Sequence, residues 1–286
     1  MTHFLDIKDF SKDQLLSIIK QAIKMKKDPL GYRFLDNKSV ALIFEKPSTR
    51  TRVSFEVGIN QCGGKAVVLQ KDEIGLGSRE PVKDVSRVLA RYLDLVMIRT
   101  FKHANLQEFA QYSSVPIING LTDHSHPCQI IADFLTIFET FKSFENLTLC
   151  YLGDGNNVTR SLVEMCSILG VKCVISTPED NKLETDYSYL YESDPKKAVS
   201  GAHIIYTDTW VSMGDSPKSL DRFKSYQVND ELMALANERA IFLHCLPAHR
   251  GEEVTDAVME STQSKIFDQA ENRLHAQKAI MHYLMA

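Results

Sequence analysis

Short apolar runs recur along the chain, and segments with helical periodicity separate them. The first run, residues 40–44, holds five consecutive apolar side chains, and the helical segment after it ends at Gly63 and Gly64. Runs of this length without polar alternation are typical of strands that are buried on both faces of a parallel sheet. Parallel neighbours need a crossover connection, and a helix is the usual one. The alternation therefore predicts an α/β fold.

The same pattern predicts the remaining elements. Further strands are expected at residues 65–69, 95–98, 115–119, 147–152, 171–175, 203–206 and 241–243. Helices are expected at residues 10–27, 53–62, 81–92, 105–112, 127–141, 161–169 and 271–285. Residues 70–80 and 212–224 are polar, and we interpret the first stretch as an exposed loop and the second as too long for a tight turn.

The strand pattern restarts after the helix at 127–141. We therefore expect two doubly wound parallel-sheet domains, residues 1–132 and 143–270, with the terminal helix 271–286 packing back on the first. A length of 286 residues suits about two domains.

Composition excludes several classes of protein. The net charge of −4 argues against a general nucleic-acid surface, and no run approaches the ~20 apolar residues of a membrane helix. The N-terminus lacks the apolar core of a signal peptide. The six cysteines are scattered without CxxC pairs, which is typical of reduced thiols. We expect a cytoplasmic enzyme with no nucleic-acid or membrane partner.

The pentad Ser-Thr-Arg-Thr-Arg at residues 48–52 lies on the turn between the first strand and its helix. The first N–H groups of a helix lack internal partners, and the helix dipole adds partial positive charge there. Three hydroxyls and two guanidinium groups on one such turn indicate an anion site, most simply for phosphate. The alternative is a helix N-cap with Glu56, but a cap needs only one hydroxyl. The glycines and lysine of a P-loop are absent.

Other polar clusters follow other predicted strands. They are Arg99-Thr100, residues 123–129, residues 153–157, residues 208–213 and residues 244–247. Ligands of parallel sheets bind beyond the carboxyl ends of the strands. We therefore expect these clusters and the pentad to form an active site in the cleft between the two domains.

Six sequence pieces, taken together, resemble the transcarbamylase family. They are Ser-Thr-Arg-Thr-Arg (48–52), His-Pro-Cys-Gln (126–129), Asp-Gly-Asn-Asn (154–157), Asp-Thr-Trp-Val-Ser-Met-Gly (208–214), His-Cys-Leu-Pro (244–247) and Glu-Asn-Arg (271–273). The first two resemble the whole family, whereas Ser-Met-Gly and His-Cys-Leu-Pro resemble its ornithine branch rather than its aspartate branch. The resemblance implies transfer of a carbamoyl group from carbamoyl phosphate to the δ-amine of L-ornithine, giving L-citrulline and phosphate, in arginine metabolism. It implies a homotrimer, and neither a metal nor an organic cofactor.

The resemblance also implies residue roles. The carbamoyl phosphate ligands would be Ser48, Thr49, Arg50, Thr51, Arg99, His126, Gln129, Cys245, Leu246 and Arg273. Arg50 would neutralise the leaving phosphate, and His126 with Gln129 would polarise the carbonyl group. Without the resemblance, His126 is a histidine at a helix start and Arg273 a solvated helix arginine.

The implied ornithine ligands are Asn157, Asp208, Ser212 and Met213. Asp208 would pair with the α-ammonium group, and Asn157 with the carboxylate. Residues 153–157 alone are equally typical of a turn. The single tryptophan, Trp210, is either a packing anchor or part of a closing lid.

Cys245 completes the expected catalytic set with Arg50 and His126. The attacking amine must be neutral, and a Cys245 thiolate could accept its proton. The alternative is an inert buried cysteine. The backbone carbonyl of Leu246 could also accept from the amine. Gly75 stands where many relatives carry Gln or His, so a side-chain contact to a neighbouring subunit is absent there.

Three other functions compete with this hypothesis. A related enzyme could carbamoylate putrescine or an N-acylated ornithine, although residues 208–213 suit an α-amino acid. A dinucleotide-binding oxidoreductase would need a third glycine after Gly153 and Gly155, and a spaced acid. A non-catalytic binding module would not need three arginines together with His126.

Overall fold

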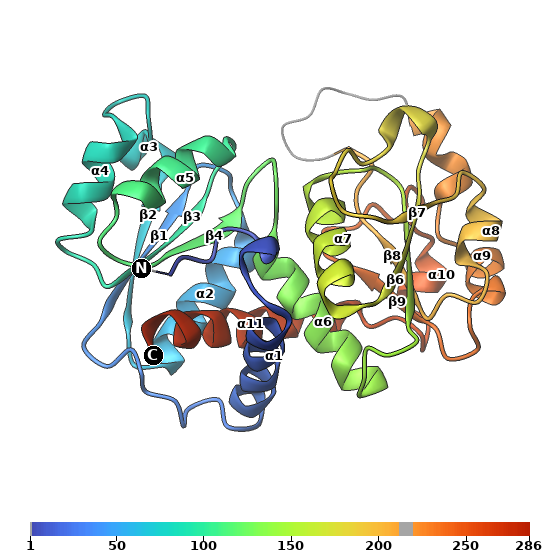
Figure 1. The fold of residues 1–286 in the computed structure, drawn as a ribbon, viewed down its shortest axis with the longest axis horizontal. Helices are drawn as coiled ribbons and strands as arrows, with labels where there is room; N and C mark the ends of the chain where they lie inside the picture. The colour runs from blue at the N-terminus through green and yellow to red at the C-terminus, as the bar shows by residue number, and fades with distance from the viewer. Residues whose placement is uncertain (1, 212–219) are drawn as a thin grey trace. The chain divides into compact units, whose positions relative to one another are not determined.

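The computed structural model describes residues 2–211 and 220–286. The chain divides into two compact units, the first formed by Met1–Leu135 with Glu271–Ala286 and the second by Thr136–Ala270. Each unit is built on one parallel sheet flanked by helices (Figure 1), which confirms the predicted α/β class.

The first sheet has four strands in the order β2-β1-β3-β4. They are β1 (Ser39–Phe44), β2 (Lys65–Gln70), β3 (Leu95–Arg99) and β4 (Ile117–Leu121). All four lie within a few residues of the predicted strands. The register sets Phe44 beside Arg99 and Arg99 beside Leu121, so β1, β3 and β4 end in one row.

Helices cover both faces of this sheet. They are α1 (Lys12–Lys27), α2 (Thr49–Gln61), α3 (Lys71–Ile74), α4 (Val82–Leu89), α5 (His103–Tyr112) and parts of α6 (Pro127–Phe141) and α11 (Ile266–Met285), with a 3-10 turn η1 (Ile7–Asp9). One face of β1 and β3 packs with apolar side chains of α4 and α5 in a buried cluster. The helices α1, α2 and α11 lie together on the other side (Figure 1).

The expected loop at 70–80 is partly helical, so that prediction was wrong for its first half. It opens with α3, which ends at Gly75 with φ +50°, a left-handed conformation that favours glycine. Ile74 and Leu76 are buried because they pack into the cluster formed with α4 and α5. Two apolar residues in a polar stretch were enough to anchor it.

The second sheet has five parallel strands in the order β7-β6-β5-β8-β9. They are β5 (Thr148–Leu152), β6 (Lys172–Ser176), β7 (Leu190–Tyr191), β8 (Ile204–Thr207) and β9 (Ile241–His244). Leu152 pairs with Thr207, and Thr207 with His244. The residues after β5, β8 and β9 therefore emerge side by side.

The helices of the second unit are α7 (Asn157–Leu169), α8 (Pro195–Val199), α9 (Asp230–Leu235) and α10 (Asp256–Met259), with 3-10 turns η2 (Glu179–Asn181) and η3 (Leu220–Tyr226). In Figure 1, α7 covers one face of the sheet and α8, α9 and α10 the other. The sequence did not predict α8, α9, α10 or β7, because elements of two to six residues are too short to show a period. Within the polar stretch 212–224, residues 212–219 lie outside the described part, and η3 buries Phe223 and Tyr226.

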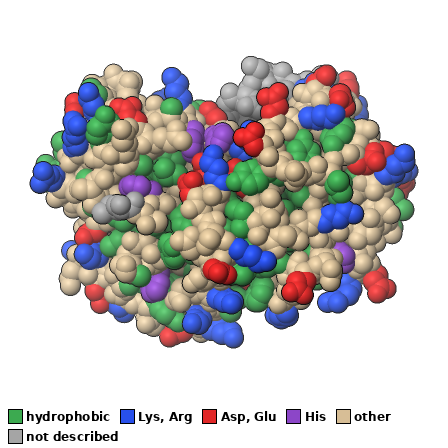
Figure 2. Space-filling model, in the orientation of Figure 1, with side chains coloured by type: hydrophobic (Ala, Val, Ile, Leu, Met, Phe, Trp, Pro, Cys, Tyr) green, Lys and Arg blue, Asp and Glu red, His purple; other side chains and the backbone are tan. Residues whose placement is uncertain are grey.

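In the described ranges 2–211 and 220–286, no helix is long and apolar enough to cross a membrane. On the face drawn in Figure 2, lysine and arginine side chains are interspersed with aspartate and glutamate. This mixture agrees with the small net charge of −4.

Candidate active site

The pentad at residues 48–52 opens helix α2. Ser48 is the N-cap, and its hydroxyl accepts a hydrogen bond from the Thr51 backbone N–H at 3.3 Å. Glu56 pairs with Arg52 at 2.9 Å and does not reach back to the cap. Capping and this exposed pair account for Ser48 and Arg52 only. Neither contact involves Thr49 or Arg50, which are both exposed at the turn, and the anion site stays a prediction.

A buried network holds Arg273 against the pentad. Arg273, on α11 and only 5% exposed, donates to Gln129 Oε1 at 2.6 Å and to Thr51 Oγ1 at 3.1 Å. Gln129 in turn donates to Asp133 at 2.8 Å. The structure thus joins three predicted site residues that are distant in sequence. The interpretation of Arg273 as a solvated helix arginine was wrong, because its side chain is enclosed.

His126, after β4, lies in the same electrostatic environment as the arginines. It is 4% exposed, and burial, followed by the charges of Arg273 and Arg99, holds its pKa well below the ordinary 6.5. The ring is therefore neutral at pH 7 and keeps one N–H that can donate to a carbonyl oxygen. Arg99 itself is the buried last residue of β3.

Sequence reasoning missed Lys46, two residues before the pentad. Its side chain is 5% exposed, and its Nζ pairs with Asp123 and lies 4.4 Å from the centre of the Phe101 ring. Lys46 therefore ties together the segments that follow β1, β3 and β4. The available signal was a lysine between a buried strand and an anion-binding turn.

In the second unit, Asp208 is the centre of the polar cluster. Its carboxylate, 8% exposed, accepts from Asn156 Nδ2 at 3.0 Å and from the Cys245 thiol at 3.0 Å. These residues follow β5, β8 and β9, which are neighbours in the sheet. In this pair the thiol is the donor and the carboxylate the acceptor.

The sequence predicted Asn157 as an ornithine ligand, and the structure places its neighbour Asn156 on Asp208. Asn156 is the N-cap of α7 and accepts from the N–H groups of Val158 and Thr159 at 3.0 and 3.1 Å. Asn157 is the first helical residue. The preference of asparagine for the N-cap position could have identified Asn156 from the sequence. The helix was predicted to start at residue 161, and this late start hid the cap. Ser212 and Met213 lie outside the described residues.

Trp210 serves as a packing anchor. It is buried and stacks on Phe223, with ring centres 5.5 Å apart and 17° between the planes. Gly153, with φ +128°, lies so close that an added Cβ would be 3.2 Å from Trp210 Cδ1. The tryptophan thus fixes the turn after β5, which supports the packing interpretation over the lid.

Cys245 differs from the other five cysteines. The other five are buried, whereas Cys245 is half-buried. Burial raises the pKa of Cys62 to about 11 and that of Cys128 to about 12. Those thiols are inert core residues, and Cys245 alone combines access with a polar partner.

Among residues 2–211 and 220–286, two groups of side chains have the spacing to hold a metal ion, Asp208 with His244 and Cys245, and His249 with Glu252 and Glu253. In the first group, the imidazole nitrogens of His244 already make hydrogen bonds at 2.9 and 3.1 Å. That histidine would have to give up a bond to bind a metal.

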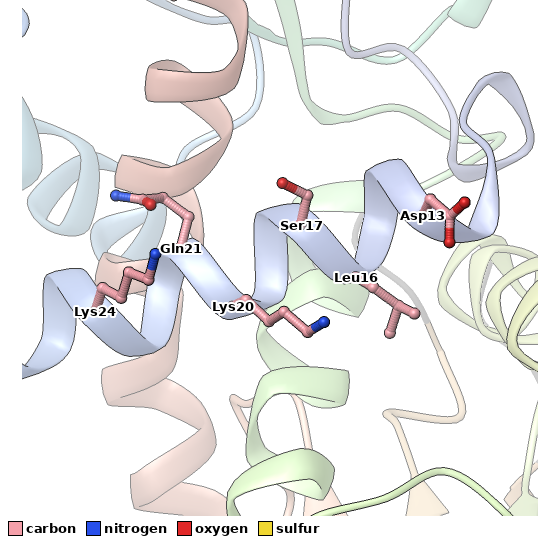
Figure 3. A pocket seen from close by; sticks show the side chains of 6 residues that line it. All are labelled: Asp13, Leu16, Ser17, Lys20, Gln21 and Lys24. Carbon is pink, nitrogen blue, oxygen red and sulfur yellow. The ribbon is translucent and has the colours of Figure 1, made fainter.

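A hollow of about 340 Å³ lies along the exposed side of α1 (Figure 3). It is lined by Asp13, Leu16, Ser17, Lys20, Gln21 and Lys24. All six come from one helix, and none is a strand-end residue. We therefore assign it no part in the candidate site.

Two family profiles match the chain. The profile described as aspartate/ornithine carbamoyltransferase, carbamoyl-P binding domain, matches residues 2–139, and the Asp/Orn binding domain of the same enzymes matches residues 145–284.

Full-length relatives agree with these matches. The chain is similar to an ornithine carbamoyltransferase of Archaeoglobus fulgidus, with 49% identity over 100% of this chain and 98% of the relative. Its fold is similar to that of ornithine carbamoyltransferase from Pyrococcus furiosus, with a TM-score of 0.94 and 41% identity over 99% of this chain and 96% of the other. It is also similar to an N-acetyl-L-ornithine transcarbamylase, with a TM-score of 0.90 and 34% identity over 99% and 100% of the two chains.

Proposed function

This chain belongs to the aspartate/ornithine carbamoyltransferase family, and from that premise we propose that it transfers the carbamoyl group of carbamoyl phosphate to the δ-amine of L-ornithine. The products are L-citrulline and phosphate. The observation that carries the proposal is that one chain holds two clusters of opposite charge. One site holds buried arginine beside a neutral histidine, and the other holds a carboxylate with an amide and a thiol.

The first unit binds carbamoyl phosphate. Ser48, Thr49, Arg50 and Thr51 receive the phosphate at the N-terminus of α2, where free N–H groups favour an anion. Arg99 and Arg273 add positive charge. Arg50 is exposed at the turn. Its guanidinium group stabilises the negative charge that develops on the leaving phosphate as the C–O bond breaks.

His126 acts on the carbonyl oxygen. Its imidazole is neutral because burial and the two arginines disfavour a further positive charge. A neutral ring donates one N–H to the oxyanion that develops as nitrogen attacks carbon. Both ends of the Gln129 amide are engaged, by Arg273 and by Asp133, which supports a role in holding Arg273.

The second unit binds ornithine. Asp208 pairs with the α-ammonium group, and Asn157, Ser212 and Met213 contribute the remaining contacts. The nucleophile is the uncharged δ-amine, whose nitrogen forms the new C–N bond and then loses one proton. In this structure the Cys245 thiol donates to Asp208 at 3.0 Å, and this pair is the proposed acceptor of the proton from the amine: the thiol proton passes to the Asp208 carboxylate as the sulfur takes the proton of the amine. The Leu246 carbonyl accepts from the amine N–H.

The decisive experiment is an acceptor competition. Purified protein is given carbamoyl phosphate with L-ornithine, N-acetyl-L-ornithine, putrescine or L-aspartate, and each carbamoylated product is measured by mass spectrometry. We expect the highest kcat/KM with ornithine, because relatives with 43–49% identity are named ornithine carbamoyltransferases. Turnover with N-acetyl-L-ornithine alone would reassign the acceptor, and no turnover with any of them would refute the proposal.

We also propose a cytoplasmic homotrimer that serves arginine biosynthesis. The reduced thiols support the compartment, and the family resemblance supports the assembly. Analytical ultracentrifugation should give three times the mass of one chain. A monomer with full activity would contradict the trimer.

A further inference from the structure

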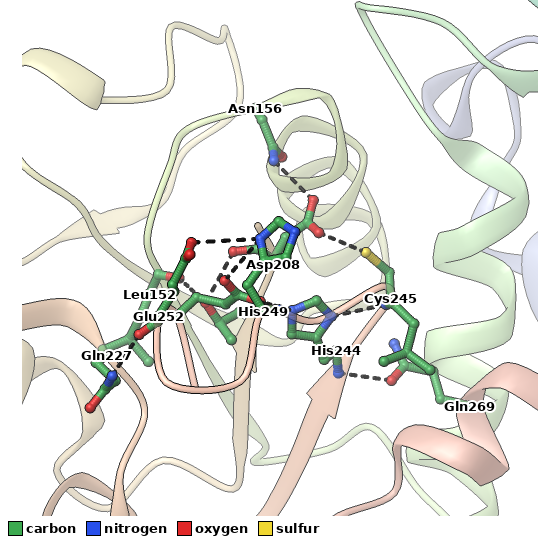
Figure 4. Close-up of polar contacts among 12 residues, drawn as sticks. Leu152, Asn156, Asp208, Gln227, His244, Cys245, His249, Glu252 and Gln269 are labelled. Atoms are coloured by element: carbon green, nitrogen blue, oxygen red, sulfur yellow. Dashed lines mark hydrogen bonds and ion pairs between the residues drawn. The ribbon is translucent and has the colours of Figure 1, made fainter. Parts of the chain in front are cut away.

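His244, the last residue of β9, is held by hydrogen bonds at both ring nitrogens (Figure 4). The backbone N–H of Leu246 donates to Nδ1 at 2.9 Å, and Nε2 lies 3.1 Å from Glu253 Oε1. An N–H group can only donate, so Nδ1 must be the acceptor. The ring proton therefore resides on Nε2 and is donated to the Glu253 carboxylate.

This chain of bonds is rigid because it is buried. The side chains of His244 and Glu253 are both fully buried, at 0% exposure. Glu253 Oε1 also accepts from the His249 backbone N–H, and the His244 backbone N–H donates to Gln269 Oε1 at 2.9 Å. The imidazole is thus fixed at its backbone and at both nitrogens.

The residue held by this chain has an unfavourable backbone. Leu246 has φ +60°, which is uncommon for any residue other than glycine. For a leucine this conformation is strained. It persists when surrounding contacts enforce it, and the bond to His244 Nδ1 is such a contact.

A different role for His244 would be to exchange a proton with its neighbour Cys245. The described contacts oppose that role. Both ring nitrogens are committed to other partners, and the Cys245 thiol donates to Asp208.

We propose that His244 and Glu253 are positioning residues for the transfer step. They hold the Leu246 backbone so that its carbonyl oxygen accepts an N–H of the attacking amine and orients the nitrogen lone pair towards the carbonyl carbon. This inference rests on the proposed function for its catalytic consequence. The tautomer and the hydrogen bonds can be tested independently of any activity.

Two substitutions at His244 separate the two ring nitrogens. The Oδ1 atom of asparagine occupies a place close to that of Nδ1, whereas the amide of glutamine reaches the place of Nε2. His244→Asn keeps an acceptor for the Leu246 N–H, and His244→Gln removes it. We expect kcat to fall on the order of tenfold in His244→Asn and on the order of a hundredfold in His244→Gln, as for loss of one positioning contact. KM for carbamoyl phosphate should be unchanged in both.

Glu253 offers a second pair with a matched control. Glu253→Gln keeps an oxygen that can accept from His244 Nε2, whereas Glu253→Leu does not. We expect the leucine variant to lose more of kcat, and the exposed neighbour variant Glu252→Leu to keep it. If Glu253 has a purely structural role, Glu253→Leu should have a lower Tm than Glu253→Gln, but the two variants should have the same kcat. Equal kcat in His244→Asn and His244→Gln at equal Tm would overturn the proposal.

Nitrogen NMR of the wild-type protein supplies the activity-independent measurement. We expect the His244 signals to show a neutral ring protonated at Nε2. A ring protonated at Nδ1 would refute the hydrogen-bond chain even in an active enzyme. Failure of ornithine turnover with the expected tautomer would refute the proposed function and leave the chain intact. A pH–rate profile that shifts in His244→Asn would instead assign His244 to proton transfer.

Discussion

The segments that follow β1, β3 and β4 in the first unit carry arginines, hydroxyls and a neutral histidine, whereas those that follow β5, β8 and β9 in the second carry a carboxylate, an amide and a thiol. In both units the candidate site residues other than Arg273 lie at or just after the ends of three adjacent parallel strands. The same topology therefore supplies the position, and the residues after the strands supply the chemistry.

Two buried groups lie beside charges of opposite sign in these regions. Burial and then Arg273 and Arg99 lower the pKa of His126, as expected beside positive charge. Burial and then Asp208 raise the pKa of Tyr151 well above its usual 10, as expected beside negative charge. A phosphate suits the first region and an ammonium group the second.

The largest expected effect is at Arg50. Arg50→Ala should cost about 3–4 kcal/mol of transition-state stabilisation, or on the order of 10²–10³ in kcat/KM for carbamoyl phosphate. Arg52→Ala is the matched control, because that exposed arginine pairs with Glu56. Steady-state kinetics of the two variants test the assignment, and equal losses would show that the turn acts only through its total charge.

A change at Asp208 should affect the other substrate. Asp208→Asn keeps the shape of the side chain but removes its charge. We expect KM for ornithine to rise roughly 30- to 150-fold, which corresponds to a loss of about 2–3 kcal/mol in binding free energy. KM for carbamoyl phosphate should not change. Asp221→Asn, an exposed acid paired with Lys224, should leave both constants unchanged. A rise in both KM values for Asp208→Asn would contradict the division between the units.

His126 makes the stability of the protein depend on pH. Below pH 6.5 the unfolded histidine binds a proton that the folded one refuses, so the free energy of unfolding falls as the pH drops. At about pH 5.5 this costs on the order of 1 kcal/mol. Relative to His126→Gln, the wild type should lose this amount between pH 7.5 and 5.5 in urea unfolding. Parallel curves for the two proteins would mean that the folded ring is protonated.

The smallest expected effect separates capping from binding at Asn156. Asn156→Ala removes an N-cap and should cost about 1 kcal/mol of stability. Asn229→Ala removes the N-cap of α9 and should cost about the same. Only the first variant should also raise KM for ornithine, because Asn156, unlike Asn229, donates to Asp208. If both variants behave alike in kinetics, Asn156 is a cap and nothing more.

Local patterns were sufficient for much of this fold. The helix predicted at 127–141 has the observed limits, because Pro127 starts it and apolar residues continue it. The start of α2 was predicted four residues late, because a helix that begins with Thr-Arg-Thr-Arg shows no apolar period in its first turn.

Contacts between distant residues were beyond local patterns. Arg273 reaches Thr51 across 222 positions and Gln129 across 144. The sequence identified each residue as a candidate by family resemblance, but it gave no sign that they bond to one another. The same holds for Cys245 and Asp208, whose hydrogen bond depends on the pairing of β8 with β9.

The uneven burial of the six cysteines leaves one thiol, that of Cys245, accessible for selective labelling. Five thiols are enclosed in the two cores, and the sixth lies beside Asp208. A small maleimide should therefore consume one equivalent per native chain and six after denaturation. A maleimide attached in this way would fill the proposed acceptor site, so bound L-ornithine should slow the labelling of Cys245.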